Sequence, residues 1–397
     1  MLTMTALSAS ERSKPLHDAV VARNEPEPRS ERAAPHAEAP SPRASAPLSA
    51  RMASLGLRAA PLLGVIGALA LGLGLIALTG VPLSRALAAF ARGVFGSDYA
   101  LVGSLMRAVP LSLVGLGYIL AERANLTNVG AEGQIAVGGI ASTAAALYGG
   151  AASLPGPLSY LYPLGAGALA GGLWGTLPGL LKARRGSNEV ITTLLLGFVG
   201  LQMVYGSVQS EALLRQPRTD SSTLPESLPI PAPTELPLLT PGSGLPLHVG
   251  VVLALLLGGV VGLTLARSAL GLRLAAVGQN ELASRRAGLP VKTLIVLALA
   301  ASGALGGLAG AIMIQGDQHY LTAGFSSGFG FDGLVVGLLA RGAAWQVLVF
   351  ALLFGALRSG GLAMEMSAQV PAAIVVVCQG LIVVATATAA ALGRRRA

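Results

Sequence analysis

The segment Gly271–Leu289, GLRLAAVGQNELASRRAGL, separates two long apolar runs, Val249–Leu265 and Leu294–Met313. Each run has the length of roughly 17–25 residues that an α-helix needs to cross the hydrocarbon core of a bilayer. Basic residues gather in the segment and beside it: Arg267, Arg273, Arg285, Arg286 and Lys292. Because loops rich in Lys and Arg stay on the cytoplasmic side, this pattern predicts a helical membrane protein with a cytoplasmic loop at 266–292.

The same loop carries the sequence signals of a short helix. Asn280 can accept a backbone N–H bond as an N-cap, and the helix formers that begin at Glu281 end at Gly288 and Pro290. A loop that only connects two spans needs neither a helix nor caps. We therefore expect a structured cytoplasmic helix on which a partner docks.

The composition of the whole chain agrees with a membrane protein. Of the 397 residues, 53% are apolar and only 11% are charged, against about 25% charged residues in soluble domains. The net charge of +9 could indicate nucleic-acid binding, but only 4% of the residues are aromatic and able to stack on bases. No nucleic-acid partner is expected. The single cysteine, Cys378, allows neither an internal disulfide nor a cysteine-rich metal site.

Residues 1–58 differ from the rest of the chain. They are rich in Pro, Ala, Ser, Glu and Arg and lack apolar periodicity, which predicts a disordered cytoplasmic tail. The first apolar run begins only near Pro61, and acidic residues are scattered through the tail, so neither a secretory signal nor a transit peptide is expected. Residues 59–397 are predicted to form the transmembrane domain.

The apolar runs of this domain predict an all-α, polytopic membrane helix bundle with about ten crossings. They cover approximately 60–80, 100–120, 127–149, 160–181, 189–209, 248–265, 294–314, 330–340, 343–359 and 371–391. The eighth is short and is interpreted as a broken or tilted helix. Segment 82–95 predicts an amphipathic helix at the outer surface. In this scheme most basic residues lie inside, Arg358 being among the few outside, so both termini are expected in the cytoplasm.

The loop 211–247 lies on the outer side in the same scheme. Prolines recur throughout it, which excludes a long helix or a central strand. Two interpretations stay open: a flexible connector, or a stiff and partly polyproline-like surface that meets an external partner.

Many of the 53 glycines fall four residues apart within the predicted spans. Small residues at this spacing let membrane helices approach closely, which predicts tight helix packing and implies no chemistry. The two ridges are Gly167, Gly171, Gly175 and Gly179, and the pairs Gly303/Gly307 and Gly306/Gly310.

Two short segments resemble each other, GAEGQIAVG at 130–138 and GFDGLVVG at 330–337. Each places a carboxylate, Glu132 or Asp332, between glycines at a predicted helix start. Because an odd number of crossings separates them, the two helices are expected to run in opposite directions. This is the pattern of an inverted repeat, which places a solute path at the interface between the repeats.

Polar residues near predicted helix starts are the candidates for that path. A carboxylate in the first helical turn is favoured by the helix dipole, so helix capping is one interpretation of the acidic members. The other is that they line a solute path, since polar groups within spans are costly and face protein or water. The candidates are Asn128, Glu132, Gln134, Asn188, Glu189 and Asp332.

Motifs of enzymes are absent from the sequence. It contains no phosphate-binding GxxxxGK[ST] loop, no HExxH or GxSxG motif, and no Cys/His cluster that would hold a metal. The chain is therefore not expected to be an enzyme, and neither a cofactor nor a metal is predicted.

Five blocks together carry a resemblance to a known family: Asn125–Gln134, Gly186–Leu194, Arg273–Gly288, Ser302–Gly310 and Gly328–Leu339. With them the chain resembles the permease subunits of bacterial ABC importers in the branched-chain amino acid/ribose/nucleoside superfamily. The likeness is closest to simple-sugar and nucleoside permeases that work with basic-membrane-lipoprotein-type binding proteins. The blocks span nearly all of residues 100–392.

The sequence departs from that family at several positions. Where members commonly show an Ala-Ala pair and Tyr-Ala-Gly in the loop helix, this chain has Ala283-Ser284 and Arg286-Ala287-Gly288. The usual Leu-Leu-Gly-Arg is Leu-Leu-Ala-Arg at 338–341, and the following Asn-Pro is Gly342-Ala343. These changes leave the resemblance intact and put the substrate and the local geometry in doubt.

The resemblance implies a permease subunit in the bacterial cytoplasmic (inner) membrane that imports a nucleoside or a simple sugar by alternating access. The implied partners are cytoplasmic ABC ATPase subunits, an extracytoplasmic solute-binding protein, a second permease subunit and membrane lipid. ATP hydrolysis would take place on the separate ATPase. The loop 266–292 would couple the two proteins through Arg273, Gly278, Gln279, Asn280, Glu281, Arg285, Arg286 and Gly288.

Two other classes remain open on the sequence. An ion- or proton-coupled secondary transporter would need an ionisable site within the membrane, for which Glu132 and Asp332 are the candidates. A non-transporting membrane scaffold would account for the tail and the outer loop but not for polar residues within the bundle.

Overall fold

The computed structural model describes residues 66–67, 70–217, 224–371 and 373–381. The predicted tail 1–58 lies outside the described residues. Within them the chain is helical, and β-structure is confined to isolated bridges. The elements are α2 Leu83–Phe95, α3 Asp98–Glu122, α4 Ala131–Tyr148, η1 Ala151–Ser153, α5 Leu158–Arg185, α6 Glu189–Gln209, η2 Ala232–Thr234, α7 Gly250–Arg267, α8 Ala269–Gln279, α9 Glu281–Arg286, α10 Val291–Ile312, η3 Met313–Gln318, α11 Phe329–Leu339 and α12 Ala344–Ala368.

The all-α membrane class is confirmed, but the count of about ten crossings is not. Among the described residues, six helices are long and apolar enough to span a membrane, or seven if a bent pair counts as one span. α11 has only 11 residues, and α4, which carries Glu132 and Gln134, is not among the helices that qualify as spans. The first and last predicted crossings run into residues outside the described part.

The bent pair consists of the helix Ala70–Leu78 and α2, which meet at 116°. α2 occupies the segment predicted as an outer amphipathic helix, and it buries Ala86, Ala89 and Val94. Its small side chains let it lie close to α12, where a Cβ at Gly93 would meet the backbone of Gly360. The helix is therefore packed on the bundle along its apolar face.

The glycine ridge of α5 and the pair Gly303/Gly307 form the contact between α5 and α10, whereas Gly306 and Gly310 face α4. A Cβ at Gly171 would lie 2.6 Å from the Cα of Gly307, and one at Gly175 would lie 3.1 Å from the Cα of Gly303. The two backbones touch directly because no side chain separates them, as small residues allow in membrane helix pairs. α10 thereby forms a central helix that also contacts α3 and α4.

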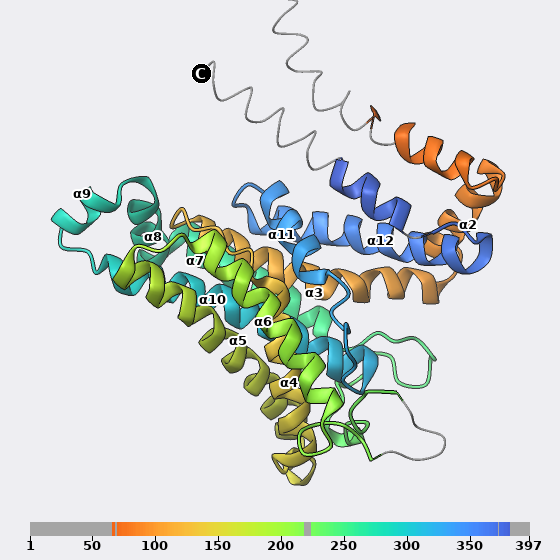
Figure 1. Ribbon diagram of the computed structural model, residues 1–397, viewed down its shortest axis with the longest axis horizontal. Helices are drawn as coiled ribbons and strands as arrows, with labels where there is room; N and C mark the ends of the chain where they lie inside the picture. The colour runs from red at the N-terminus through yellow and green to blue at the C-terminus, as the bar shows by residue number, and fades with distance from the viewer. Residues whose placement is uncertain (1–65, 68–69, 218–223, 372, 382–397) are drawn as a thin grey trace, which may run out of the picture. The chain divides into compact units, whose positions relative to one another are not determined.

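Figure 1 shows α8 and α9 at one end of the bundle and the long loop between α6 and α7 at the other. We call these the α9 end and the η2 end. α10 starts at the α9 end, since it follows α9 directly, and α3 finishes there, where Gly278 of α8 lies against the backbone of Arg123.

The proline-rich loop packs on the bundle in its described parts. Leu214, Ile230, Thr234 and Leu236 are buried, and the backbone N–H of Ile230 donates to the carbonyl of His319 at 2.7 Å. The backbone N–H groups of Ser227 and Leu236 likewise donate to the carbonyls of Leu321 and Gln315, so the loop is tied to η3 and to the residues that follow it. The described parts of this loop are therefore packed on the bundle and do not form a flexible connector.

Candidate functional site

The starts of α4 and α11 meet inside the bundle. The carboxylate of Glu132, in the first turn of α4, accepts hydrogen bonds from the start of α11: from the hydroxyl of Ser326 at 2.6 Å, the N–H of Gly328 at 2.9 Å and the N–H of Gly330 at 2.6 Å. Glu132 is only 4% exposed. Backbone N–H groups at a helix start lack partners within their own helix, and here a side chain of another helix supplies the acceptor.

The two helices leave this junction in opposite directions. Gly333 and Gly337 of α11 lie against successively later turns of α3, so α11 runs with α3 toward the α9 end. Gly306 and Gly310 of α10 lie against successively later turns of α4, so α4 runs with α10 toward the η2 end. The opposite directions expected of an inverted repeat are confirmed, whereas a solute path between the two helices remains a prediction.

Glycine makes the close approach at the junction feasible. A Cβ at Gly330 would lie 2.5 Å from the Cα of Glu132 and would overlap its backbone nitrogen. Gly328 has a φ of +79°, in the left-handed region that favours glycine, and the turn it makes presents its N–H to the carboxylate. Both glycines at the start of α11 therefore have a structural reason.

Asp332 does not repeat the role of Glu132. Its carboxylate lies 3.5 Å from a guanidinium nitrogen of Arg358 in α12, and both side chains are 18% exposed. Arg358 also donates to the carbonyl of Ser327, and its Cζ lies 3.9 Å from the centre of the Phe329 ring. Arg358 lies near the end of the predicted ninth crossing, within α12, and binds the start of α11; its placement on the outer side stays a prediction.

Asn128 and Gln134 form a second polar cluster beside the junction. The Asn128 amide nitrogen donates to Gln134 Oε1 at 2.9 Å and to the Ser302 hydroxyl of α10 at 2.8 Å. Its oxygen accepts from the N–H of Gly130 at 3.0 Å, which shapes the turn before α4. Asn128 and Gln134 are each 2% exposed. Their bonds satisfy polar groups that would otherwise be costly inside the bundle.

Asn188 and Glu189 lie apart from these clusters, at the start of α6. The Asn188 side chain accepts from the N–H of Val190 at 2.9 Å as an N-cap, and Glu189 pairs with Lys182 of α5 at 2.8 Å. These are the contacts of a capped helix start. The six candidate path residues thus form two groups. Four of them lie at the junction and in the polar cluster beside it, whereas Asn188 and Glu189 lie at a separate helix start at the α9 end.

The charged loop after α7 forms two helices. α9 begins at Glu281 after the N-cap Asn280, whose side chain accepts from the N–H of Ala283 at 2.9 Å, and Gly288 has a φ of +81°. The predicted loop helix and its end are confirmed. The sequence analysis missed α8, which is signalled by Ser268, an N-cap that accepts from the N–H of Gly271.

Gly278, one of the expected coupling residues, packs closely against the bundle. It lies inside α8, where a Cβ would sit 2.6 Å from the carbonyl oxygen of Arg123. Its role is a close contact with the turn after α3. The hairpin of α8 and α9 is therefore held against the bundle on one face.

The other face of the α8–α9 hairpin is open. Leu272 is 73% exposed and Leu282 is 58% exposed. Arg285 donates to Glu281 at 2.9 Å on the surface of α9. Further exposed residues of the expected coupling set are Arg273, Gln279, Asn280 and Arg286. Exposed leucines among charged residues are the composition of a docking surface.

A further polar centre occupies the η2 end and was not anticipated from the sequence. Gln315, fully buried in the π-helical turn η3, donates to the carbonyls of Tyr160 at 3.0 Å and Thr234 at 2.6 Å. The backbone carbonyl of Gln315 accepts from the backbone N–H of Leu236 at 2.9 Å. The one available signal was a glutamine at the end of an apolar run.

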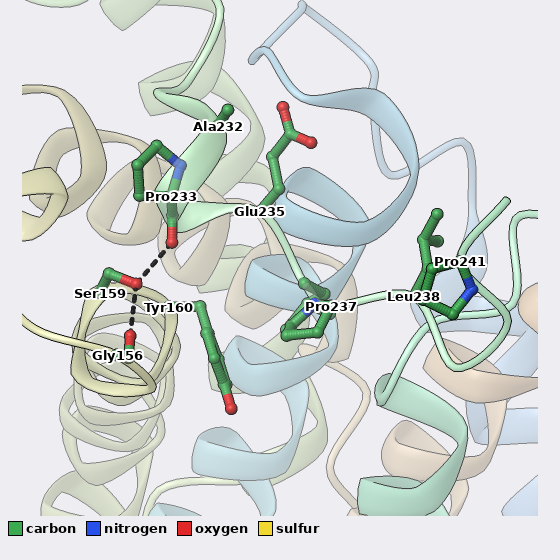
Figure 2. Close-up of a pocket in the computed structure, with 10 residues that line it drawn as sticks. Gly156, Ser159, Tyr160, Ala232, Pro233, Glu235, Pro237, Leu238 and Pro241 are labelled. Atoms are coloured by element: carbon green, nitrogen blue, oxygen red, sulfur yellow. Dashed lines mark hydrogen bonds between the residues drawn. The ribbon is translucent and has the colours of Figure 1, made fainter.

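Figure 2 shows the hollow beside this centre, an open depression of about 520 Å³ between the start of α5 and the outer loop. The Ser159 hydroxyl lies 2.5 Å from the carbonyl oxygen of Pro233 and so ties the two walls together. The carboxylate of Glu235 is the charged group at its rim. The hollow is a feature of the η2 end and lies apart from the α4–α11 junction.

Comparisons with known proteins agree with this architecture. A family model described as branched-chain amino acid transport system / permease component matches residues 100–387. The guanosine ABC transporter permease protein NupP of Bacillus subtilis (strain 168) is 34% identical over 84% of this chain and 93% of its own. The glucose ABC transporter permease protein TsgB13 of Haloferax volcanii is 34% identical over 81% and 85%.

A third relative, the nucleoside ABC transporter permease protein NupB of Lactococcus lactis subsp. cremoris (strain MG1363), is 30% identical over 72% of this chain and 79% of its own. No solved structure matches. The family model covers α3 through α12, and therefore the junction and the α8–α9 hairpin. The chain belongs to this family of permease components.

Proposed function

We propose that this chain, paired with a second permease subunit that is identical or homologous, forms the solute path of an ATP-driven ABC importer for a nucleoside or a simple sugar. The solute class is supported by the names of the relatives, which are guanosine, nucleoside and glucose permeases. The importer lies in the bacterial cytoplasmic membrane with both termini in the cytoplasm, as the basic residues of the loops favour.

The observation that carries this proposal, beside the family match, is the exposed α8–α9 hairpin. α9 has six residues, too few to be stable alone in water, where helices shorter than about 12–15 residues are marginal. Its cap and its contact through α8 hold it on the bundle, while Leu282 and Arg285 face outward. A cytoplasmic ATPase that grips this surface could transmit closure to the bundle. ATP hydrolysis belongs to that separate subunit.

The polar chemistry of the bundle suits an uncharged solute. Glu132 is fully bonded to α11, and Asp332 is paired with Arg358. Neither carboxylate is an unpaired group of the kind that an ion- or proton-coupled transporter would use, which favours the ATP-driven reading over that alternative. Asn128, Gln134 and Ser302 are uncharged and bond to one another, so they add no charge to the bundle.

The mechanism is alternating access, in which helix groups rock against one another about a central site. A solute-binding protein delivers the solute at the η2 end. Closure of the ATPase on the α9 end shifts α8 and α9, and Gly278 passes the shift to the turn after α3. In this mechanism α4 and α11 lie near the central site about which the helix groups move.

The test is uptake by purified proteins in vesicles. The permease, its ATPase and its binding protein are reconstituted, and accumulation of radiolabelled guanosine and glucose is measured with and without ATP. Accumulation of either solute that requires both ATP and the binding protein supports the proposal. Uptake that follows a proton or sodium gradient without an ATPase would contradict it.

A further inference from the structure

The carboxylate of Glu132 joins two groups of helices that pack with different neighbours. α4 packs against α5, α6 and α10, whereas α11 packs against α3 and α12, and the two groups also touch through α3 and α10. α4 and α11 meet at their first turns, where Glu132 accepts the bonds from Ser326, Gly328 and Gly330. The joint therefore depends on one side chain of α4 and on three donors at the start of α11.

Electrostatics gives the carboxylate a reason to be there. A helix N-terminus carries the equivalent of about +0.5 charge, so two helix starts brought together repel each other. One negative charge between them offsets that repulsion, and burial strengthens the effect because water screens it little. Glu132 uses both of its oxygens for the donors of α11, and it is 4% exposed. Its surroundings are those of a tie between helices rather than of a group that lines a path.

We propose that Glu132 is a positioning residue that keeps the starts of α4 and α11 together throughout the transport cycle. The two helix groups then rock about this joint and do not separate at it. The inference rests on the proposed import function, because a joint matters for transport only if the groups move. It assigns Glu132 a role that depends on the reach of its side chain as well as on its charge.

Two substitutions separate reach from charge. Glu132→Gln keeps the length and loses the charge, whereas Glu132→Asp keeps the charge and is shorter by about 1.5 Å, one carbon–carbon bond. If Glu132 positions α11, both variants lose ATP-driven uptake of guanosine or glucose by about tenfold or more, because a hydrogen bond to a charged group contributes at least that factor. If Glu132 only supplies charge to a path, the Asp variant transports normally. If it only caps a helix, both variants transport normally.

Two further changes approach the same joint from α11, in case the Glu132 variants do not fold, and Ser326→Ala is the milder of the two. Gly330→Ala introduces a methyl that would collide with the backbone of Glu132, and Ser326→Ala removes one of the three donors. We expect Gly330→Ala to match the Glu132 variants and Ser326→Ala to show a smaller loss. The matched controls are Gly259→Ala, which meets nothing within 4 Å, and Ser112→Ala, whose hydroxyl bonds within its own helix. Both controls should transport like the parent.

Hydrogen exchange tests the joint independently of transport. In the parent complex the amides of Gly328 and Gly330 are bonded to Glu132 and should exchange slowly, and in Glu132→Gln and Glu132→Asp the peptide covering 326–332 should exchange faster. Unchanged exchange would overturn the joint itself. Faster exchange with normal uptake in both Glu132 variants would overturn the positioning role. A parent that accumulates neither solute with ATP would count against the proposed function, while the exchange result would still decide the joint.

Discussion

Replacing Gly171 by alanine tests how closely α5 and α10 must approach. The new methyl would overlap the carbonyl oxygen of Gly303 and lie 2.6 Å from the Cα of Gly307. Both obstacles are backbone atoms, which cannot swing away as a side chain could. The helices must therefore separate or tilt, and every contact along their shared ridge weakens.

The magnitude follows from two opposing effects. Overpacking of a tight site costs about 1–3 kcal/mol, while alanine in place of glycine stabilises a helix by about 0.5–1 kcal/mol. Gly165 lies in the same helix with nothing within 4 Å of a Cβ, so Gly165→Ala should show only the gain. The helix gain is common to both variants and cancels, so they should differ by the overpacking cost alone, about 1–3 kcal/mol, with Gly171→Ala the less stable.

The assay is the midpoint of thermal unfolding of the purified permease in one detergent. A change of 1 kcal/mol shifts the midpoint of a domain of this size by about 2–4 °C. Gly171→Ala should melt several degrees below Gly165→Ala. Equal midpoints, or a more stable Gly171→Ala, would refute the direct backbone contact between α5 and α10.

Two further predictions concern the η2 end and the sides of the membrane. Gln315→Leu leaves the carbonyls of Tyr160 and Thr234 without their hydrogen-bond donor, which costs about 1–3 kcal/mol for each carbonyl. Protease added from outside should therefore cut the outer loop faster than in the parent. An unchanged rate would show that Gln315 does not hold the loop. In a Cys378→Ser background, a cysteine at the exposed position Ser243 should react with an impermeant maleimide from outside and one at Leu282 only from the cytoplasm; external labelling at Leu282 would invert the orientation and remove the basis for ATPase docking.

The elements that sequence alone predicted are those set by local rules. The two ends of α9 could be predicted from Asn280 before the helix and Gly288 after it, and the glycine ridge on α5 from the spacing of its glycines. Capping and small-residue spacing act within a few residues, so they can be read without knowing what lies across the bundle.

The junction could be predicted only in part. The likeness of the two motifs gave the opposite directions of α4 and α11, but not the bonds between them. Glu132 and Ser326 are 194 residues apart in the chain, and no local pattern shows that their helices meet. The pair of Arg358 with Asp332 was likewise not predictable, because the two residues come from different helices. The count of about ten crossings is not confirmed among the described residues, where helices buried among other helices need not be uniformly apolar.

The most direct test of the account is whether the α8–α9 hairpin couples the bundle to an ATPase. Gly288→Val forces a β-branched residue into a φ of +81°, and the double change Arg285→Glu/Arg286→Glu reverses the charge on the exposed face of α9. Arg184→Glu/Arg185→Glu, at the end of α5, makes the same charge change outside the hairpin and is the control.

The measurement is ATP hydrolysis by the reconstituted complex with and without solute-loaded binding protein. We expect the two hairpin variants to insert and assemble normally but to lose stimulation by the loaded binding protein together with uptake, and the control to be stimulated like the parent. If both hairpin variants respond to the loaded binding protein as the parent does, the hairpin is not the docking element and the coupling mechanism proposed for this permease is wrong.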